Sequence, residues 1–288
     1  MKNVLVTGGL GFVGSHLVEL LLKNQDSEIT VIDNLISESA SKDNMRPGVR
    51  YWIDDICNLN SYKYHNEKFD TVFHLAALAR IQPSFKDPLS YLSIDMMGTA
   101  HVLEFARNRG SNVVYAGSSS AYGGPMLNPY AFAKYTGEQI CEMYSKVYGM
   151  STVTARFFNV YGARQPVTGP YATVVGIFED QKLRGIPLTV TGDGEQRRDF
   201  THVSDIASGL VSLSEGTHTG EVYNLGTGKN YSINELAGLF SPIEIKYLPQ
   251  RPGEARNTLA DISETVAKTG WKPQINIEDY IKQFISQF

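Results

Sequence analysis

Strand-like and helix-like stretches alternate through the first half of the chain, and this order limits the possible folds more than any other feature. The expected strands are short runs rich in β-branched residues, at 2–6, 28–32, 49–52, 71–74, 112–116 and 152–157. The expected helices are longer stretches with one apolar face, at 14–22, 88–107 and 129–148. Because crossover helices join parallel strands, this alternation predicts an α/β fold with a doubly wound parallel sheet.

The pattern changes after about Asn159, where proline and glycine become frequent and the regular alternation stops. This change predicts a second, smaller domain of mixed α/β structure, with loops that bind a ligand. A helix expected at 203–213 and a strand expected at 222–225 would return the chain to the large sheet. We therefore expect a larger domain of residues 1–158 and about 199–225, a smaller domain of residues 159–198 and about 226–288, and a cleft between them.

Composition excludes several classes of partner. The 288 residues are 42% hydrophobic and 19% charged, an ordinary balance for a globular chain. The net charge is −4 with no block of Lys and Arg, so nucleic acid is not an expected partner. No apolar run approaches the roughly 20 residues that span a bilayer, and the first residues lack a signal-peptide pattern. The cysteines and histidines lack the spacing of disulfide or metal sites, so we expect no metal and a cytoplasmic setting.

Three glycines, Gly8, Gly11 and Gly14, stand between the first expected strand and the first expected helix. In a dinucleotide-binding turn they permit, in order, the tight turn, the close approach of a pyrophosphate and the packing of the helix on the sheet. A turn without a ligand is the alternative, and Asp33 at the end of the second strand disfavours it. A carboxylate there accepts hydrogen bonds from ribose hydroxyls and repels a 2′-phosphate, and Asn34 lies on the same rim. The sequence thus predicts a Rossmann-type domain that prefers NAD to NADP.

Tyr130 and Lys134 lie one turn apart on the third expected helix, so a phenol and an ammonium group share one face. This spacing alone has little weight, because the chain has 16 tyrosines and such pairs arise by chance. Its weight comes from Ser118, Ser119 and Ser120, where an apolar strand ends in hydroxyl groups. Open α/β sheets bind their ligands at the carboxyl ends of the strands. We therefore expect these side chains to meet in one site.

Further motifs follow in order along nearly the whole chain: His74-Leu75-Ala76-Ala77, Arg156-Phe157-Phe158-Asn159-Val160-Tyr161-Gly162, Arg198-Asp199-Phe200-Thr201-His202-Val203-Ser204-Asp205 and Arg251-Pro252-Gly253-Glu254. With the glycine turn, Asp33, the serine run and the Tyr130/Lys134 pair, they resemble the extended short-chain dehydrogenase/reductase family. Within that family the pattern is similar to the nucleotide-sugar epimerases of the UDP-glucose 4-epimerase type. Each motif alone is common, whereas the combination is specific.

The resemblance implies a catalytic role for four residues. Tyr130 would be the base that removes a proton from a sugar hydroxyl, and Lys134 would hold the nicotinamide ribose. Lys134 and the positive nicotinamide would lower the pKa of Tyr130, which is otherwise near 10. Ser118 would donate a hydrogen bond to the reacting oxygen, with Ser119 as the second choice. A hydride would pass from the sugar to NAD and return to the other face of the resulting keto sugar.

The resemblance also implies two sets of binding residues. Those at the NAD cofactor are Gly8, Gly11, Phe12, Val13, Gly14, Asp33, Asn34, Asp55, Ile56, Leu75, Ala76, Ala77, Tyr130, Lys134 and Phe158. Those at the substrate are Asn159, Arg198 and Arg251 near the nucleotide diphosphate, and Thr258 near the sugar. Arg80 is either a group that faces the sugar or a structural one.

The serine run separates this chain from some relatives. Related 4,6-dehydratases carry Thr-Asp-Glu there, because the elimination of water needs an additional acid and base. Ser118–Ser120 contain no carboxylate, which favours NAD-dependent C4 epimerisation of a UDP-sugar. A nucleotide-sugar 4,6-dehydratase or reductase and a non-catalytic NAD-binding regulatory protein remain as alternatives. By analogy with the family, the expected helices 88–107 and 129–148 would form the interface of a homodimer.

Overall fold

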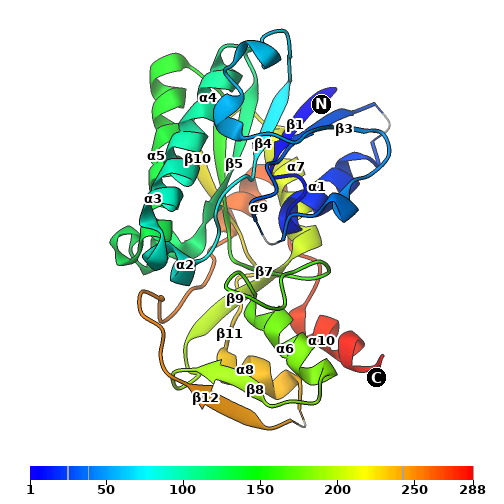
Figure 1. Ribbon diagram of the computed structural model, residues 1–288, viewed down its shortest axis with the longest axis vertical. Helices are drawn as coiled ribbons and strands as arrows, with labels where there is room; N and C mark the ends of the chain where they lie inside the picture. Colours follow the sequence, from blue (N-terminus) through cyan, green and yellow to red (C-terminus); the bar gives the residue numbers. More distant parts are fainter. Residues whose placement is uncertain (25, 38, 242, 288) are drawn as a thin grey trace.

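A parallel sheet with the strand order β10-β6-β5-β4-β1-β2-β3 forms the centre of the larger unit in the computed structural model (Figure 1). The structure describes residues 1–24, 26–37, 39–241 and 243–287. All neighbouring strands of this sheet pair in parallel, which confirms the expected doubly wound α/β fold. The strands are β1 (Asn3–Thr7), β2 (Glu28–Ile32), β3 (Val49–Trp52), β4 (Thr71–His74), β5 (Asn112–Ser118), β6 (Thr152–Phe157) and β10 (Glu221–Leu225).

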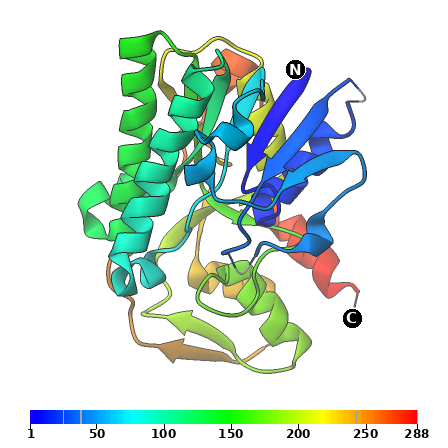
Figure 2. The same ribbon diagram turned by 45° about the horizontal axis from the view of Figure 1, so that its top comes forward.

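Helices cover both faces of this sheet (Figure 2). On one face they are α1 (Phe12–Leu21) and α7 (Val203–Ser214), and on the other α4 (Gly98–Arg107) and α5 (Pro129–Tyr148). Each face has its own apolar core, in which buried residues such as Leu210 on the first and Leu103 on the second are fully excluded from solvent. Burial of this apolar surface holds the layers together and fixes the carboxyl edge of the sheet, where the site lies.

The helical stretch expected at 88–107 is not one regular helix. It consists of α3 (Pro88–Tyr91), a π-helical segment (Leu92–Met97) and α4. Asp95 lies in the π-helical segment, where its Oδ1 accepts a hydrogen bond of 2.7 Å from the Leu78 N–H. This wider turn brings a buried carboxyl beside the loop after β4, a tertiary contact that periodicity cannot predict. The short helix α2 (Ile81–Lys86) before it was also not predicted.

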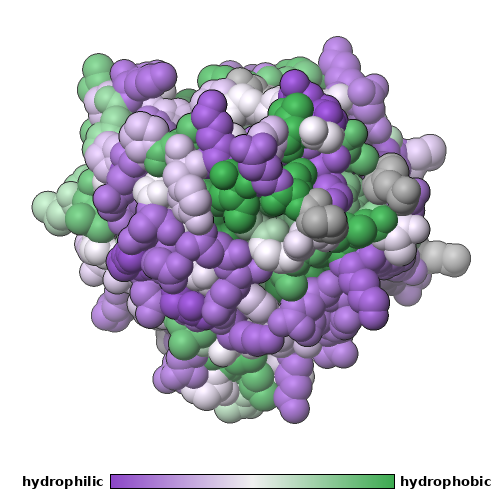
Figure 3. All heavy atoms as spheres, turned by 90° about the horizontal axis from the view of Figure 1, so that it is seen from below, coloured by the Kyte–Doolittle hydropathy of each residue, from purple (hydrophilic) through white to green (hydrophobic). Residues whose placement is uncertain are grey.

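The smaller unit contains two small sheets and the helices that pack on them. Strands β7 (Asn159–Tyr161), β9 (Arg197–His202) and β11 (Asn230–Ser232) form one sheet, and β8 (Leu188–Thr191) and β12 (Ile245–Leu248) form the other. A third apolar core joins them to α6 (Val174–Leu183), α8 (Ile233–Leu239) and α10 (Ile277–Ile285). Viewed from this end, apolar side chains gather near the centre of the molecule and polar ones surround them (Figure 3).

The remaining described elements are short. Five 3₁₀ turns lie in the larger unit: Lys42–Asn44, Ile56–Asn58, Tyr62–Tyr64, Ser119–Gly123 and Pro125–Leu127. Helix α9 (Ser263–Thr269) lies between β12 and α10 in sequence and contacts β10. After it, Trp271 packs into the core of the larger unit together with Leu210 and Leu225. The C-terminal segment therefore connects both units.

The chain crosses between the units more than once. It leaves the large sheet after β6, returns at Val203 where α7 begins, and adds β10 to the sheet as the sequence predicted. We propose the division into 1–158 with about 199–225 and 159–198 with about 226–288 as two domains. In this division β9 carries the chain back from the smaller sheet to α7.

Candidate active site

One cavity between the two units brings all the predicted site residues together. From the larger unit these are Gly8, Gly11, Phe12, Val13, Gly14, Asp33, Asn34, Asp55, Ile56, Leu75, Ala76, Ala77, Arg80, Ser118, Ser119, Tyr130 and Lys134. From the segments after β6 they are Phe158, Asn159, Arg198, Arg251 and Thr258. Residues up to 250 positions apart in the sequence thus share one cavity, because the carboxyl edge of the large sheet faces the smaller unit.

The three glycines of the turn allow close backbone packing at the start of α1. Gly8 has a φ of +69°, and a Cβ there would lie 2.7 Å from the Ala76 nitrogen. A Cβ on Gly14 would lie 2.2 Å from the Gly8 carbonyl oxygen, so the helix packs as closely as the sequence predicts. Gly11 caps the helix without a side-chain hydrogen bond, and a Cβ there would lie 3.4 Å from the Gly8 carbonyl oxygen and 3.8 Å from Ser39 Oγ, so the contact is looser than at Gly8 or Gly14. The free N–H groups of this first turn therefore suit a pyrophosphate.

Asp33 ends β2 on the rim of the cavity. Its Oδ2 accepts a hydrogen bond of 3.0 Å from the Leu10 N–H, and its Oδ1 accepts one of 2.9 Å from the Leu35 N–H. Burial raises the pKa of Asp33, whereas these two N–H groups lower it. Asn34 donates to Asp55 Oδ2 at 2.9 Å, so the rim is a connected polar edge. This edge fits the adenosine part of NAD, where a carboxylate would accept from the ribose hydroxyls.

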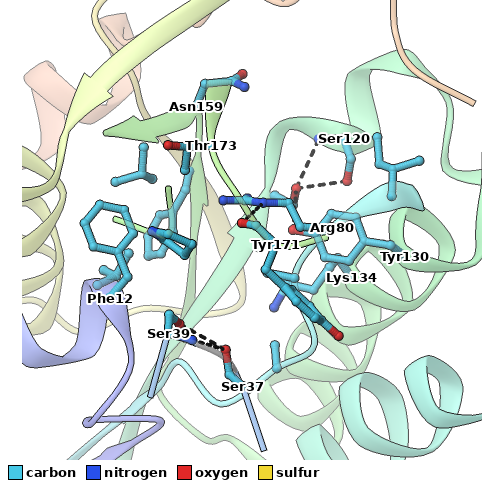
Figure 4. Close-up of a pocket in the computed structure, with 18 of the residues that line it drawn as sticks. Phe12, Ser37, Ser39, Arg80, Ser120, Tyr130, Lys134, Asn159, Tyr171 and Thr173 are labelled. Carbon is cyan, nitrogen blue, oxygen red and sulfur yellow. Dashed lines mark hydrogen bonds between the residues drawn. The ribbon is translucent and has the colours of Figure 1, made fainter. Parts of the chain in front are cut away.

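Tyr130 and Ser118 are in direct contact. The Tyr130 hydroxyl donates a hydrogen bond of 3.2 Å to Ser118 Oγ, and the Ser120 hydroxyl donates one of 2.9 Å to the same atom (Figure 4). Tyr130 is placed by the start of α5, where the Asn128 side chain accepts from the Ala131 N–H at 2.8 Å. Of the two serines predicted for catalysis, the contact with the phenol is therefore made by Ser118.

Lys134 is not among the main influences on the pKa of Tyr130 in this structure. Burial raises the pKa of Tyr130, and the groups that oppose burial are the Ser118 hydroxyl and the Arg80 guanidinium. The Lys134 ammonium group lies 4.6 Å from the ring centroid of Tyr115 and makes no hydrogen bond to any described residue. Burial lowers the pKa of Lys134, and the Asp95 carboxylate is the largest opposing influence. The ammonium group thus remains available to a ligand such as the nicotinamide ribose.

A buried chain of hydrogen bonds supports the floor of the cavity. Thr7 Oγ1 and His74 Nδ1 are 2.8 Å apart, and His74 Nε2 and Thr99 Oγ1 are 3.0 Å apart. Burial lowers the pKa of His74 to about 3, so the ring is neutral. Thr7 Oγ1 also accepts from the N–H groups of Leu75 and Ala76, both at 3.1 Å. His74 therefore positions the loop that lines the cofactor end.

Two arginines from the segments after β6 also line the cavity. Arg198 lies 3.5 Å from Glu254, measured from Nη2 to Oε2, and burial lowers its pKa. Arg251 lines the cavity from the segment after β12, and Asn159 begins β7 next to Phe158, which also lines the cavity. Thr258 is buried, and its N–H donates to the Arg197 carbonyl oxygen at 3.1 Å. Cations from two separate segments thus line the cavity in which a diphosphate is expected.

Several residues that line the cavity were not predicted from the sequence. Tyr171 and Thr173 come from the loop before α6, and Ser37 and Ser39 come from the loop after β2 (Figure 4). Gln196 lines the cavity just before β9. These residues lie in irregular segments without a motif, so only the folded chain reveals their position.

The comparisons with known proteins agree with this geometry. The model of the NAD dependent epimerase/dehydratase family matches residues 4–226. A putative UDP-glucose 4-epimerase of Methanocaldococcus jannaschii is 33% identical over 304 residues, which cover 98% of this chain and 97% of that protein. UDP-glucuronic acid decarboxylase 6 of Arabidopsis thaliana is 31% identical over 96% of this chain and 86% of its own.

Solved structures give the same result. The crystal structure of UDP-glucose 4-epimerase from Thermotoga maritima, determined with UDP-glucose, has a TM-score of 0.92 and 30% identity over 99% of both chains. The fold, the shared cavity and these matches confirm the resemblance to the extended short-chain dehydrogenases/reductases and identify NAD as the cofactor. The chain belongs to the NAD-dependent epimerase/dehydratase family.

Proposed function

We propose that this protein inverts the configuration at C4 of a UDP-sugar through a transient 4-keto intermediate. The observation that carries the proposal is the contact of Tyr130 with Ser118 in the cavity that also contains Asp33 and the uncapped start of α1. A base, a hydroxyl donor and a dinucleotide site in one cavity are the parts that reversible oxidation of an alcohol needs. The name of the Thermotoga maritima enzyme and its bound UDP-glucose support this choice.

Bound NAD would accept a hydride from C4 of the sugar and return it. The protein must then move one proton, hold the reacting oxygen and exclude competing reactions. Tyr130 takes the proton from the C4 hydroxyl, and Ser118 stabilises the oxygen by a hydrogen bond. Burial raises the pKa of Tyr130, so the phenolate needs positive charge close to it. Arg80 provides such charge from this chain's own side chains.

The diphosphate would bind at Arg198 and Arg251, which line the cavity. Guanidinium groups suit phosphate because they donate two parallel hydrogen bonds. Asn159 supplements them from β7. The sugar then lies between these arginines and Tyr130, with C4 directed toward the phenol.

The serine run favours epimerisation over the reactions of other family members. Ser118 and Ser120 are hydrogen-bonded to each other, and Ser119 is buried beside them. No carboxylate occupies these three positions. Dehydration at C5 and C6 needs an acid and a base there, so a 4,6-dehydratase is the weaker candidate. A non-catalytic NAD-binding protein would have no need of the Tyr130–Ser118 contact.

We also propose that the protein is a cytoplasmic homodimer. The helical layer α3–α5 exposes apolar side chains, with 76% of Leu89, 56% of Met97 and 63% of Val147 accessible to solvent. Burial of this surface against a second copy would remove apolar area from water. Both cysteines are free thiols, which suits a reducing compartment. No described helix is long and apolar enough to cross a bilayer.

The test is a substrate panel with a matched variant. Purified protein is incubated with UDP-glucose, UDP-galactose, UDP-N-acetylglucosamine and UDP-glucuronate, and the products are separated by chromatography. At least one 4-epimer should form, and Tyr130→Phe should abolish its formation while NAD stays bound. Tyr135→Phe changes a tyrosine of the same helix outside the cavity and should remain active. Release of CO₂ or a 4-keto-6-deoxy product in place of an epimer would reject the proposal.

A further inference from the structure

Arg80 carries an uncompensated positive charge beside the catalytic tyrosine. It lies between β4 and α2, and its side chain extends across the cavity near Tyr130 and Tyr171 (Figure 4). Its Nε donates a hydrogen bond of 2.9 Å to the Tyr171 carbonyl oxygen. Among the described residues, no other hydrogen bond and no carboxylate within 4.0 Å engage its guanidinium group. The two terminal nitrogens are therefore free to bind a ligand.

The other partly buried arginines have polar partners for their terminal nitrogens. Arg109 donates to the carbonyl oxygens of Phe105 and Tyr64. The others have carboxylate partners, for example Arg156 with Glu138 at 2.6 Å, Arg164 with Glu19 at 2.7 Å and Arg198 with Glu254 at 3.5 Å. A buried charge without a partner is costly, and burial lowers the pKa of Arg80 accordingly. A ligand that brought a negative charge to this position would remove that cost.

The backbone of Arg80 is also strained. Its φ is 139° and its ψ is 144°, a region that glycine adopts readily and residues with a side chain avoid. The residue precedes the first turn of α2 but provides no side-chain cap for that helix. Strain of this kind persists where the surrounding structure enforces it, and it is found most often at ligand-binding positions. The guanidinium group is thus held at the cavity by its backbone and by Tyr171.

Arg80 lies beside the tyrosine that would bind the C4 hydroxyl of the sugar. Figure 4 shows the two side chains next to each other, and the Tyr130 phenol is the largest influence that opposes the lowered pKa of Arg80. In the proposed reaction the C4 hydroxyl is bound at Tyr130. The C6 group is attached to the neighbouring ring carbon, C5, and so it reaches the space beside the phenol where Arg80 ends.

We infer that Arg80 binds a carboxylate at C6, so that the substrate is a nucleotide-linked uronic acid. This inference rests on the proposed function, which places C4 at Tyr130. A planar carboxylate matches the two terminal N–H groups of a guanidinium in a bidentate pair. A hydroxymethyl or an N-acetyl group would accept a hydrogen bond but would leave the charge uncompensated.

The same ion pair protects the intermediate. Oxidation at C4 of a uronic acid gives a β-keto acid, which loses CO₂ when the electron pair of the C5–C6 bond moves into the C4 carbonyl. The ionised carboxylate has its charge localised on two oxygens, whereas the charge spreads into the ring as CO₂ leaves. Arg80 stabilises the localised charge more strongly, so it favours return of the hydride over loss of CO₂.

Binding measurements test the inference without turnover. The NAD-loaded Tyr130→Phe protein is titrated with UDP, UDP-glucose and UDP-glucuronate by calorimetry, with and without Arg80→Gln. In the Tyr130→Phe protein that keeps Arg80, UDP-glucuronate should bind at least about tenfold more tightly than UDP-glucose. Arg80→Gln should weaken UDP-glucuronate roughly 10- to 100-fold and alter UDP-glucose and UDP by less than about threefold. Arg80→Lys keeps the positive charge but cannot donate two parallel hydrogen bonds. This variant should still prefer UDP-glucuronate to UDP-glucose, by a smaller factor.

Three outcomes separate the possibilities. Equal affinity for the two sugars, or a preference that survives Arg80→Gln, would overturn the inference and leave the proposed function intact. If Arg80 acts only on the pKa of Tyr130, its replacement in the active protein would shift the pH profile of turnover but not the affinities, which also overturns it. If UDP itself does not bind, the proposed function fails and the inference fails with it.

Discussion

The Tyr130 hydroxyl donates to Ser118 Oγ over 3.2 Å, and this contact joins helix α5 to the last residue of strand β5. Ser118 ends the strand, so its side chain lies at the carboxyl edge of the sheet. Tyr130 lies in the first turn of α5, just after the capping residue Asn128. Two elements of the larger unit thus fix the distance between the proposed base and its hydroxyl partner.

Replacement of the serines should distinguish their roles. Ser118→Ala removes the hydroxyl that contacts Tyr130 and should lower kcat about 100-fold, the loss typical of one donor to a reacting oxygen. Ser119→Ala is the matched control and should lower kcat less than about threefold, because no hydrogen bond joins Ser119 to Tyr130 among the described residues. Initial rates of epimer formation measure both. Similar losses in the two variants would contradict the assignment of Ser118.

Asp33 should determine the choice of cofactor. Asp33→Asn removes the negative charge but keeps one oxygen to accept from the backbone. The affinity ratio of NAD to NADP should fall about tenfold or more, because the repulsion of a 2′-phosphate is lost together with charged hydrogen bonds to ribose. Fluorescence titration with both cofactors measures the ratio. Asp26→Asn changes an exposed residue outside the cavity and is the control. An unchanged affinity ratio in Asp33→Asn would show that Asp33 does not determine the choice between NAD and NADP.

Asp95 should make stability depend on pH. It is 1% exposed, its Oδ2 has no hydrogen-bond partner, and burial raises its pKa to about 7. The carboxyl is protonated in both states below about pH 4. As pH rises toward 7 the unfolded chain loses the proton first, so the folded state loses stability, by at most about 4 kcal/mol.

Asp95→Asn removes this titration and keeps an oxygen to accept from Leu78. The variant should gain stability over the unchanged protein at about pH 8 and show a smaller difference at about pH 5. Urea unfolding at the two pH values measures the free energy of unfolding. A difference between the proteins that does not grow with pH would contradict the raised pKa of Asp95.

The proposed dimer can be tested on the helical layer. Val147→Glu and Met97→Glu place charges on its exposed apolar face and should convert a dimer into a monomer. Leu183→Glu changes a residue on α6 of the smaller unit that is 54% exposed, and should leave the dimer intact. Sedimentation velocity measures the mass. A monomer before any substitution, or a dimer in all three variants, would reject this interface.

Much of the larger unit could be predicted because local signals and tertiary structure agree there. The strand at 28–32 and the helix at 129–148 have the expected bounds, since apolar periodicity, Asn128 and Gly149 define them locally. The tight turn at Gly8 and the close helix packing at Gly14 were predictable, because each requires a residue without a side chain. The π-helical segment around Asp95 was not, because a contact with the distant Leu78 N–H accompanies it.

The substrate end was less predictable for a related reason. Arg80 could face the sugar or serve a structural role, and only its strained backbone and its contact with the Tyr171 carbonyl oxygen separate the two. Tyr171 itself lies in a loop without a motif. The pKa of Tyr130 depends on groups from separate segments, among them Ser118 and Arg80, whereas the family resemblance pointed to Lys134.

The most direct test follows the hydrogen at C4. A UDP-sugar labelled with deuterium at C4 is incubated with the NAD-loaded protein, and the epimer is analysed by mass spectrometry and NMR. If the hydride leaves C4 and returns within one active site, the product retains the deuterium at C4 and no reduced cofactor accumulates. Loss of the label to solvent, or a product with inverted C4 formed equally well by Tyr130→Phe, would contradict the proposed chemistry.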